Sequence, residues 1–418
     1  MNFLNEIALR FPDAISFAAG RPHDGFFSVD LVHRYVDTYL AHLRRETGGD
    51  EVAVRRTLLQ YGRTKGVIGD LVARALAVDE GIEVDQESIV VTVGAQEALY
   101  LVLRALRSDE ADVALGVSPG YTGFTGAARL ADMPVLPVPG GPDGLDLPAL
   151  RDTLSRARAQ GRRPRVLYVN TDFANPTGAS LTRAARHALL RLAEDEDILV
   201  LEDNPYGVFS GDREPPPTLK ALDTARRVVH VGSFAKTVFP GARVGFVVAD
   251  QPVTLAGRTG PLADQLAKLK SLLTVNTSPV AQAVVAGKLL ENGLSIRAAN
   301  KREIEVYQQN LRLLRDGLAA AFPAADWPGV RWNDPGGGFF LLLDVPFAAD
   351  DAALARSARD HGVLWTPMHH FHADFHADFH ADDQPRRQMR LSFSHLGPDE
   401  ITEGLTRLTR FVKESSPA

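Results

Sequence analysis

Short apolar runs alternate with helix-like stretches through the first two thirds of the chain. The runs are rich in Val, Ile and Leu, which is typical of strands buried on both faces of a sheet. They lie at 88–93, 112–117, 165–170, 198–201, 228–231 and 244–248. Because helix-like stretches such as 95–106 separate most of them, the pattern predicts an α/β fold with a mainly parallel sheet flanked by helices.

The pattern changes after residue 276. Thr277–Phe322 is helical in character, and we expect two helices there, the second of which leaves the large domain. The elements expected after it are a strand at 339–344, a helix at 350–361, strands at 363–365 and 389–393, and a terminal helix. The predicted parts are an N-terminal arm and helix (1–50) that joins the small domain, a large domain (51–295) and a small α+β domain (296–418).

Length, charge and cysteine content narrow the function classes. A chain of 418 residues is long enough for two domains. Its net charge of −6 argues against a broad affinity for nucleic acid. It has no cysteine, which excludes disulfides, thiolate nucleophiles and cysteine-ligated zinc. We see neither a signal peptide nor an apolar run of the roughly 18 residues that a membrane helix needs, so we expect a cytoplasmic protein.

One loop between two expected strands carries a lysine in a distinctive setting. Lys236 lies between Ser233 and Arg243, at a sheet end, where α/β proteins bind ligands. A lysine that forms a Schiff base must lose its proton and be held still, and a hydroxyl with a guanidinium nearby suits a phosphate dianion. A surface lysine in an ordinary turn explains the same loop, and the loop alone favours that interpretation.

Four other strand ends carry polar or aromatic residues. Asp203 could pair with a protonated pyridine nitrogen or be a surface acid. Asn175, in Asn-Pro-Thr-Gly, could donate to a phenolate oxygen or shape a turn. Ala95 and Gln96 open a helix, a common arrangement that also binds anions. Tyr121 could stack on a flat cofactor or pack in the core.

In their order and spacing these residues resemble the fold-type I pyridoxal 5'-phosphate (PLP)-dependent aminotransferases, especially the branch with the α-aminoadipate and kynurenine aminotransferases. The resemblance runs from about Ile15 to Phe411. It implies the PLP-transferase fold type I, PLP as cofactor, and an amino acid and a 2-oxo acid as substrates.

The resemblance assigns a role to each residue around the cofactor. Lys236 would bind PLP covalently and shuttle the proton between the substrate α-carbon and the C4′ carbon of the cofactor. Asp203 would pair with the pyridine nitrogen, Asn175 and Tyr206 would hold the phenolic oxygen, and Tyr121 would stack on the ring. The residues expected to hold the phosphate are Ala95, Gln96, Ser233 and Arg243.

The resemblance also assigns the substrate contacts and a second subunit. Tyr61 resembles the tyrosine that reaches the phosphate from the partner, which implies a homodimer with shared active sites. Arg390 would bind the substrate α-carboxylate in a bidentate manner, although it could be an ordinary strand arginine. Gly20 would lie over the substrate, and Asn175 would contact it too. Arg21 could bind a polar substrate group or form a salt bridge within the arm, and we favour the salt bridge.

Ala235 and Arg21 depart from the family pattern, and the His-rich repeat falls where the family has a variable loop. Ala235 stands where the family often has a serine, so one phosphate hydrogen bond is expected to be lost or replaced. A His-rich loop (369–383) contains Phe-His-Ala-Asp three times, at 371–382. Histidines 372, 376 and 380 could share a helix face and bind a metal. We expect an inert variable loop instead and no metal, because the PLP chemistry needs none.

The motifs indicate the cofactor more specifically than they indicate the reaction or the substrate. The expected carboxylate-binding arginine favours transamination. The N-terminal segment 3–22 resembles arylglycine-forming transaminases of glycopeptide-antibiotic biosynthesis, which make 3,5-dihydroxyphenylglycine and 4-hydroxyphenylglycine from arylglyoxylates. The alternatives are a broad aromatic or α-aminoadipate aminotransferase, a PLP-dependent oxidase or cyclase, and the ligand-sensing domain of a transcriptional regulator. We disfavour the regulator because the arm begins by about residue 15, which leaves no room for a DNA-binding domain.

Overall fold

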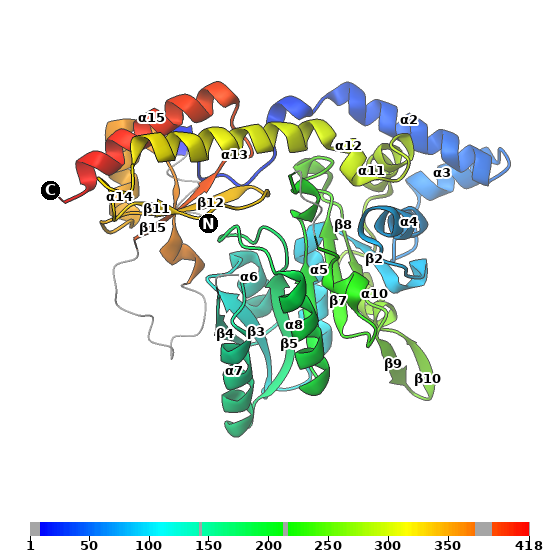
Figure 1. The fold of residues 1–418 in the computed structure, drawn as a ribbon. Coiled ribbons are helices and arrows are strands. Elements are labelled where there is room, and N and C mark those ends of the chain that lie inside the picture. Colours follow the sequence, from blue (N-terminus) through cyan, green and yellow to red (C-terminus); the bar gives the residue numbers. More distant parts are fainter. Residues whose placement is uncertain (1–8, 142–143, 212–215, 373–386, 418) are drawn as a thin grey trace.

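The computed structural model describes residues 9–141, 144–211, 216–372 and 387–417. Its largest sheet has seven strands in the order β2-β8-β7-β6-β5-β3-β4 (Figure 1). β8 is antiparallel to both neighbours and the other pairs are parallel. The strands are β2 (Ile89–Thr92), β3 (Asp112–Ser118), β4 (Val135–Pro139), β5 (Arg163–Asn170), β6 (Leu199–Asp203), β7 (Val228–Ser233) and β8 (Gly245–Val248). The expected mainly parallel sheet is therefore confirmed.

Helices cover both faces of this sheet (Figure 1). Alternate residues of one strand enter different cores: Val90 of β2 packs in one cluster and Val91 in another. Burial on both faces is the reason why the strands read as continuous apolar runs. The helices of this part are α2 (Val29–Glu46), α3 (Glu51–Leu59), α4 (Gly69–Glu80), α5 (Gly94–Leu106), α6 (Thr122–Leu130), α7 (Leu147–Ala159), α8 (Arg183–Asp195), α9 (Leu219–Leu222) and α10 (Leu262–Leu273). No helix of the described residues is long and apolar enough to cross a membrane.

A second, antiparallel sheet of four strands lies in the C-terminal part, in the order β11-β12-β15-β14. Its strands are β11 (Arg331–Trp332), β12 (Phe340–Asp344), β14 (Thr366–Pro367) and β15 (Gln388–Ser392). Helices α13 (Lys301–Ala321), α14 (Asp351–Arg356) and α15 (Pro398–Ser415) accompany this sheet. The antiparallel strands with their helices form an α+β unit.

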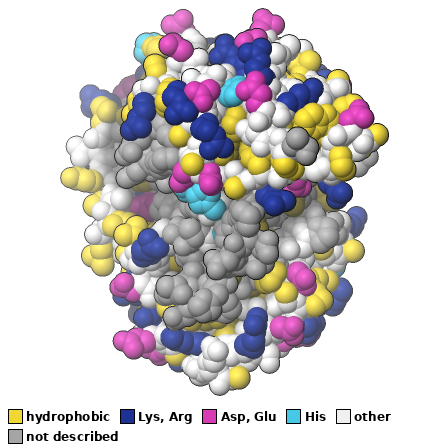
Figure 2. Space-filling model, turned by 90° about the vertical axis from the view of Figure 1, so that its left-hand side faces the viewer, with side chains coloured by type: hydrophobic (Ala, Val, Ile, Leu, Met, Phe, Trp, Pro, Cys, Tyr) yellow, Lys and Arg dark blue, Asp and Glu magenta, His cyan; other side chains and the backbone are white. Residues whose placement is uncertain are grey.

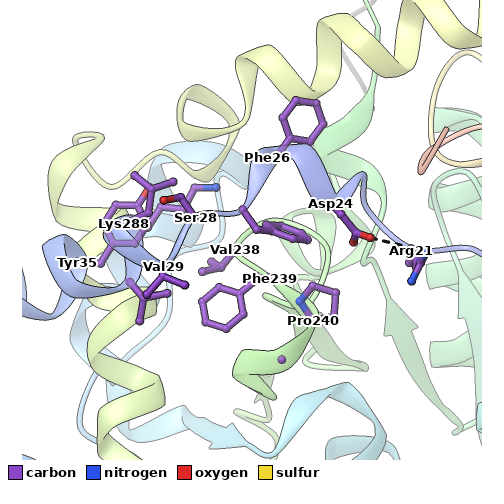
Figure 3. Close-up of a pocket in the computed structure, with 14 residues that line it drawn as sticks. Arg21, Asp24, Phe26, Ser28, Val29, Tyr35, Val238, Phe239, Pro240 and Lys288 are labelled. Carbon is purple, nitrogen blue, oxygen red and sulfur yellow. Dashed lines mark ion pairs between the residues drawn. The ribbon is translucent and has the colours of Figure 1, made fainter. Parts of the chain in front are cut away.

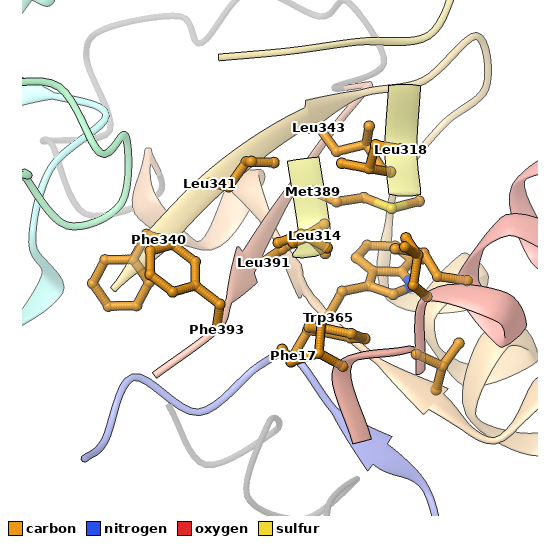
Figure 4. Close-up of a cluster of buried hydrophobic side chains, with 14 of the residues drawn as sticks. Phe17, Leu314, Leu318, Phe340, Leu341, Leu343, Trp365, Met389, Leu391 and Phe393 are labelled. Carbon is orange, nitrogen blue, oxygen red and sulfur yellow. The ribbon is translucent and has the colours of Figure 1, made fainter. Parts of the chain in front are cut away.

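The N-terminal arm packs into this α+β unit. Strand β1 (Ile15–Ser16) pairs in parallel with β13 (Val363–Leu364). The fully buried ring of Phe17 joins a core with Trp365 and Leu391 (Figure 4). The arm is thereby fixed where it passes the sheet, and the next residues, from Ala18 onward, reach the cavity described below.

Three boundaries differ from the sequence expectation. Residues 277–322 form three helices, not two: α11 (Pro279–Glu291), the short α12 (Ile296–Ala299) and α13. The break comes where Gly293 and Leu294 take positive φ angles, which a helix cannot continue. The expected strand at 363–365 already ends at Leu364, as β13, and after Trp365 a separate strand, β14, begins in another sheet. The expected helix at 350–361 changes to a π-helical turn at Ser357–His361.

Sequence reasoning missed several strands and could not reach one segment. The missed strands are β1, β4, β11, β14 and the hairpin β9 (Pro252–Leu255) with β10 (Arg258–Pro261). Most of the Phe-His-Ala-Asp repeat, including His376 and His380, lies outside the described residues. The domain boundaries near residues 50 and 295 stay a prediction.

Candidate active site

One cavity, of about 420 Å³, gathers almost all of the predicted site residues. Strands β3, β5, β6 and β7 run parallel, so their carboxyl ends meet at one sheet edge, where α/β proteins bind ligands. The predicted residues that line the cavity are Gly20, Arg21, Ala95, Gln96, Tyr121, Asn175, Asp203, Tyr206, Ser233, Lys236, Arg243 and Arg390. Tyr61 is not among them, and 86% of this residue is exposed.

Lys236 follows the end of β7 and points to the arm. Its Nζ donates a hydrogen bond to the carbonyl oxygen of Gly20 at 2.7 Å. Burial, and after it the positive charges of Arg390 and Arg243, lower the pKa of Lys236 to about 8. A lysine with this pKa is a substantial fraction neutral in mildly alkaline solution, which is the state that attacks a carbonyl carbon.

Asp203 is the last residue of β6 and has one oxygen without a partner. Its Oδ2 accepts a hydrogen bond from the Tyr168 hydroxyl at 2.7 Å, and the Tyr168 ring stacks on Phe124 at 4.1 Å. Its Oδ1 is buried and has no hydrogen-bond partner. Burial raises the pKa of Asp203 to about 6. A buried carboxylate oxygen without a partner suits a cationic N–H donor from a ligand.

The amino end of α5 and Arg243 lie in close contact. A Cβ added to Gly94, at φ +72°, would lie 2.5 Å from Nη2 of Arg243. A Cβ on Gly245 would lie 2.7 Å from the backbone nitrogen of Ala95. Only glycine allows this approach, which brings a guanidinium to the first turn of the helix, where N–H groups have no partner within the helix itself. A helix amino end beside an arginine guanidinium is the kind of site that can hold a phosphate.

Two predicted phosphate ligands already make other hydrogen bonds. Gln96 donates from Nε2 to the carbonyl oxygen of Gly123 at 2.5 Å. The Ser233 hydroxyl accepts from the backbone nitrogen of Ala235 at 3.2 Å and keeps its own proton to donate. The side chain of Gln96 is therefore turned to α6.

Arg390, on β15, is buried between two aromatic rings. Its guanidinium carbon lies 4.4 Å from the ring centre of Phe340 and 4.8 Å from that of Phe371. Nη1 donates to Oδ1 of Asn175 at 2.7 Å, and Nη2 donates to the carbonyl oxygen of Ala18 at 2.6 Å. Its Nε has no partner, and within the described part of the chain no carboxylate pairs with it. A buried cation without a counter-ion is arranged for an anionic ligand.

The arm contributes Gly20 and Arg21 in different ways. A Cβ on Gly20 would lie 2.6 Å from the Phe340 ring, so the arm fits closely over the cavity. Arg21 is exposed and forms an ion pair with Asp24 at 3.7 Å, the arm salt bridge that we favoured from the sequence. It also lines a second cavity of about 500 Å³, whose wall includes Phe239 (Figure 3).

Sequence reasoning missed several residues that shape the site. They are Tyr168, which holds Asp203, the rings of Phe340 and Phe371, and Thr366, whose hydroxyl accepts from Arg390 at 3.1 Å. Tyr168 lies in an apolar strand and reads as a core residue. Its one signal is the hydroxyl, since a buried tyrosine hydroxyl needs a partner.

The residues present fit PLP. The partnerless Oδ1 of Asp203 would accept from the protonated ring nitrogen, and the anion site beside Arg243 would take the phosphate. Lys236 lies in the same cavity with a lowered pKa, as covalent attachment requires.

Comparisons with known proteins agree with this geometry. The family model "Aminotransferase class I and II" matches residues 30–408. The (S)-3,5-dihydroxyphenylglycine transaminase of Amycolatopsis orientalis is 54% identical over 99% of this chain and 91% of its own length. The 2-aminoadipate transaminase of Thermus thermophilus is 31% identical over 96% of this chain and 91% of its own.

A solved structure shows the same architecture. The kynurenine aminotransferase of Pyrococcus horikoshii, solved in complex with PMP, has a TM-score of 0.81 and 27% identity. The match covers 99% of this chain and 95% of that chain. The fold is therefore the PLP-dependent fold type I, as the sequence led us to expect, with PLP as the cofactor. This chain belongs to the class I and II aminotransferases.

Proposed function

We propose that this enzyme transfers an amino group between an amino acid and an aryl 2-oxo acid, with 3,5-dihydroxyphenylglyoxylate and 4-hydroxyphenylglyoxylate as acceptors. The observation that carries the proposal is the 54% identity, over nearly the whole chain, to a transaminase of (S)-3,5-dihydroxyphenylglycine. The aromatic-amino-acid aminotransferase of Thermococcus litoralis is 28% identical, and the 2-aminoadipate enzyme 31%. A place in glycopeptide-antibiotic biosynthesis and a cytoplasmic location are part of the same proposal.

We assign a separate role in the reaction to each of three charged residues of the cavity. Bound PLP supplies an electron sink for the substrate α-carbon. Lys236 would hold the cofactor and then, as a free amine, would move the proton between the substrate α-carbon and the C4′ carbon of the cofactor. Asp203, ionised against the ring nitrogen, keeps that nitrogen protonated. Arg390 holds the substrate α-carboxylate through its guanidinium.

The other residues position these groups. The side-chain oxygen of Asn175 accepts from Arg390, and Asn175 also lies beside the buried Tyr206. We assign Asn175 and Tyr206 to the phenolic oxygen of the cofactor. Tyr121 would stack on the ring. Gly20 lies over the cavity, where the arm covers the substrate and excludes water.

We also propose that the enzyme is a homodimer in which Tyr61 completes the partner's phosphate site. Large exposed apolar side chains support a covered face: Leu59, two residues before Tyr61, is 71% exposed, and Leu272, near the end of α10, is 87% exposed. A Cβ on Gly62 would lie 3.7 Å from the Asn276 side chain, so the segment with Tyr61 adjoins the one that follows α10.

A panel of acceptors tests the substrate. Purified enzyme is assayed with hydroxyphenylglyoxylates, phenylpyruvate and 2-oxoadipate, with tyrosine or glutamate as donor. We expect the highest kcat/KM with the arylglyoxylates. Inert arylglyoxylates beside a reactive 2-oxoadipate would refute the aryl proposal. Oxygen consumption without any 2-oxo acid would identify an oxidase.

Borohydride trapping tests the lysine. Reduction of the holoenzyme should fix the cofactor on the peptide that contains Lys236, seen by mass spectrometry. A Lys236→Ala variant should carry no label and lose at least about 100-fold in kcat. A label on any other lysine contradicts the assignment.

A further inference from the structure

A cluster of two histidines and one aspartate lies outside the catalytic cavity. Asp351 opens α14, and His369 and His370 lie in the short 3₁₀ helix η6 (Met368–Phe371). Nε2 of His370 lies 2.8 Å from Oδ1 of Asp351, and Nε2 of His369 lies 3.3 Å from the same oxygen. All three are partly buried. Figure 2 shows histidine and acidic side chains side by side on one face of the molecule.

The spacing of these donor atoms suits one small metal ion. Two atoms that bind the same zinc ion at about 2.1 Å lie roughly 3–3.5 Å apart. The two distances from nitrogen to oxygen are close to that range, and all three donor atoms lie within 4.8 Å of one another. Two imidazoles with one carboxylate favour zinc, nickel or copper over magnesium or calcium, which prefer oxygen ligands.

The cluster is joined to the catalytic cavity through the next residue along the chain. Phe371 directly follows His370, and its ring lies against the guanidinium of Arg390. Its carbonyl oxygen accepts from the backbone nitrogen of Gly120 at 3.1 Å, next to Tyr121. Phe371 therefore connects η6 directly to the guanidinium of Arg390.

We propose that Asp351, His369 and His370 bind one divalent transition-metal ion, of the zinc class, and that this ion fastens η6 to α14 and so holds Phe371 against Arg390. The metal takes no part in amino transfer. Its effect on substrate rests on the proposed role of Arg390 as the carboxylate ligand, whereas binding of the metal does not.

Zinc binding to the holoenzyme tests the site. Chelator-treated and dialysed holoenzyme is titrated with zinc chloride by calorimetry, and bound zinc is counted by elemental analysis. We expect one zinc per chain and a higher midpoint of thermal unfolding with zinc present. His369→Gln with His370→Gln, and separately Asp351→Asn, should weaken zinc binding at least about tenfold.

Two controls separate this site from other histidines. His361 lies 3.5 Å from Glu414 in a pair of one histidine and one carboxylate, so His361→Gln should leave zinc affinity unchanged. His376→Gln with His380→Gln removes two histidines of the repeat and should do the same. Unchanged affinity in the His369/His370 variant overturns the site, as does loss of binding in the repeat variant.

Kinetics test the link to Arg390. With any 2-oxo acid that the enzyme accepts, zinc should lower KM severalfold and leave kcat nearly constant, because a better-held Arg390 binds the carboxylate more tightly. Phe371→Ala should keep one zinc per chain but lose this response. A KM of the parent enzyme that does not change with zinc overturns the link to Arg390. The conclusion of the acceptor panel does not depend on that result.

Discussion

At the scale of single residues, the charge of Arg390 acts on Lys236. Each positive charge in a cavity disfavours a second one, so Arg390→Met should raise the pKa of Lys236 from about 8. The neutral amine captures PLP, so the capture rate of cofactor-free enzyme should rise with pH and level off above about 8. In the variant this rise should move to higher pH, as measured by stopped-flow absorbance. Arg359→Met, an exposed change in the small domain, should not move it; equal shifts in both variants would contradict the charge effect.

The ionised, buried carboxylate of Asp203 should lower the stability of the cofactor-free enzyme. Its folded-state pKa of about 6 lies above the unfolded value, so its contribution to stability is full at low pH and is lost as pH rises through 6. Asp203→Asn should therefore raise the free energy of unfolding of the cofactor-free enzyme at pH 8, by on the order of 1–3 kcal/mol, with a smaller difference at pH 5. The same variant should release PLP more readily. Denaturant unfolding of both proteins at pH 5 and pH 8 measures this difference in the free energy of unfolding. A difference that is the same at both pH values would refute the cost of the buried charge.

At the scale of elements, the contact between α5 and β8 depends on glycine. Gly245→Ala should push the helix start from the strand, because its Cβ would also lie 2.9 Å from the carbonyl oxygen of Gly232. We expect a loss of about 1–3 kcal/mol in the free energy of unfolding and weaker cofactor binding. Gly126→Ala is the matched control, since no atom lies within 4 Å of its added Cβ in α6. That helix should gain about 0.5–1 kcal/mol; a similar loss in both variants would show that contact is not the cause.

How well each strand could be predicted depended on whether its burial leaves a recognisable apolar run in the sequence. Strands buried on both faces leave apolar runs, and polar side chains at their ends identified the site. The run at 198–201 concealed the true end of β6, because Glu202 is a buried strand residue whose oxygens accept from the backbone nitrogens of Leu219 and Lys220. β4 contains two prolines and lies at the sheet edge, where prolines are tolerated, so its run was not recognised.

The surroundings of Arg390 show what sequence could not supply. Its position within the strand β15 was predictable, but the two rings that enclose it come from β12 and η6. Nothing in the local pattern distinguishes Phe340 or Phe371 from other core phenylalanines. Only the packing of the small domain brings them to one guanidinium, together with the arm carbonyl of Ala18.

At the scale of the whole molecule, Tyr61 is separated from the other predicted site residues. Every other predicted site residue lines one cavity of a single chain, whereas the exposed Tyr61 lies two residues after the end of α3, whose last residue, Leu59, is exposed too. In a symmetric dimer with shared sites, Tyr61 of each chain would serve the site that contains the other chain's Lys236.

Subunit mixing tests this arrangement. Tyr61→Ala should bind PLP weakly and Lys236→Ala should be inactive, so each variant alone has two defective sites. When the two are unfolded and refolded together, half of the dimers should be mixed, and each mixed dimer should contain one site with both residues intact. Roughly a quarter of all sites would then be restored. Recovery of activity to about that level, with light scattering showing dimers, supports shared sites. Activity no greater than the sum of the separate variants would mean that Tyr61 serves its own chain or no site.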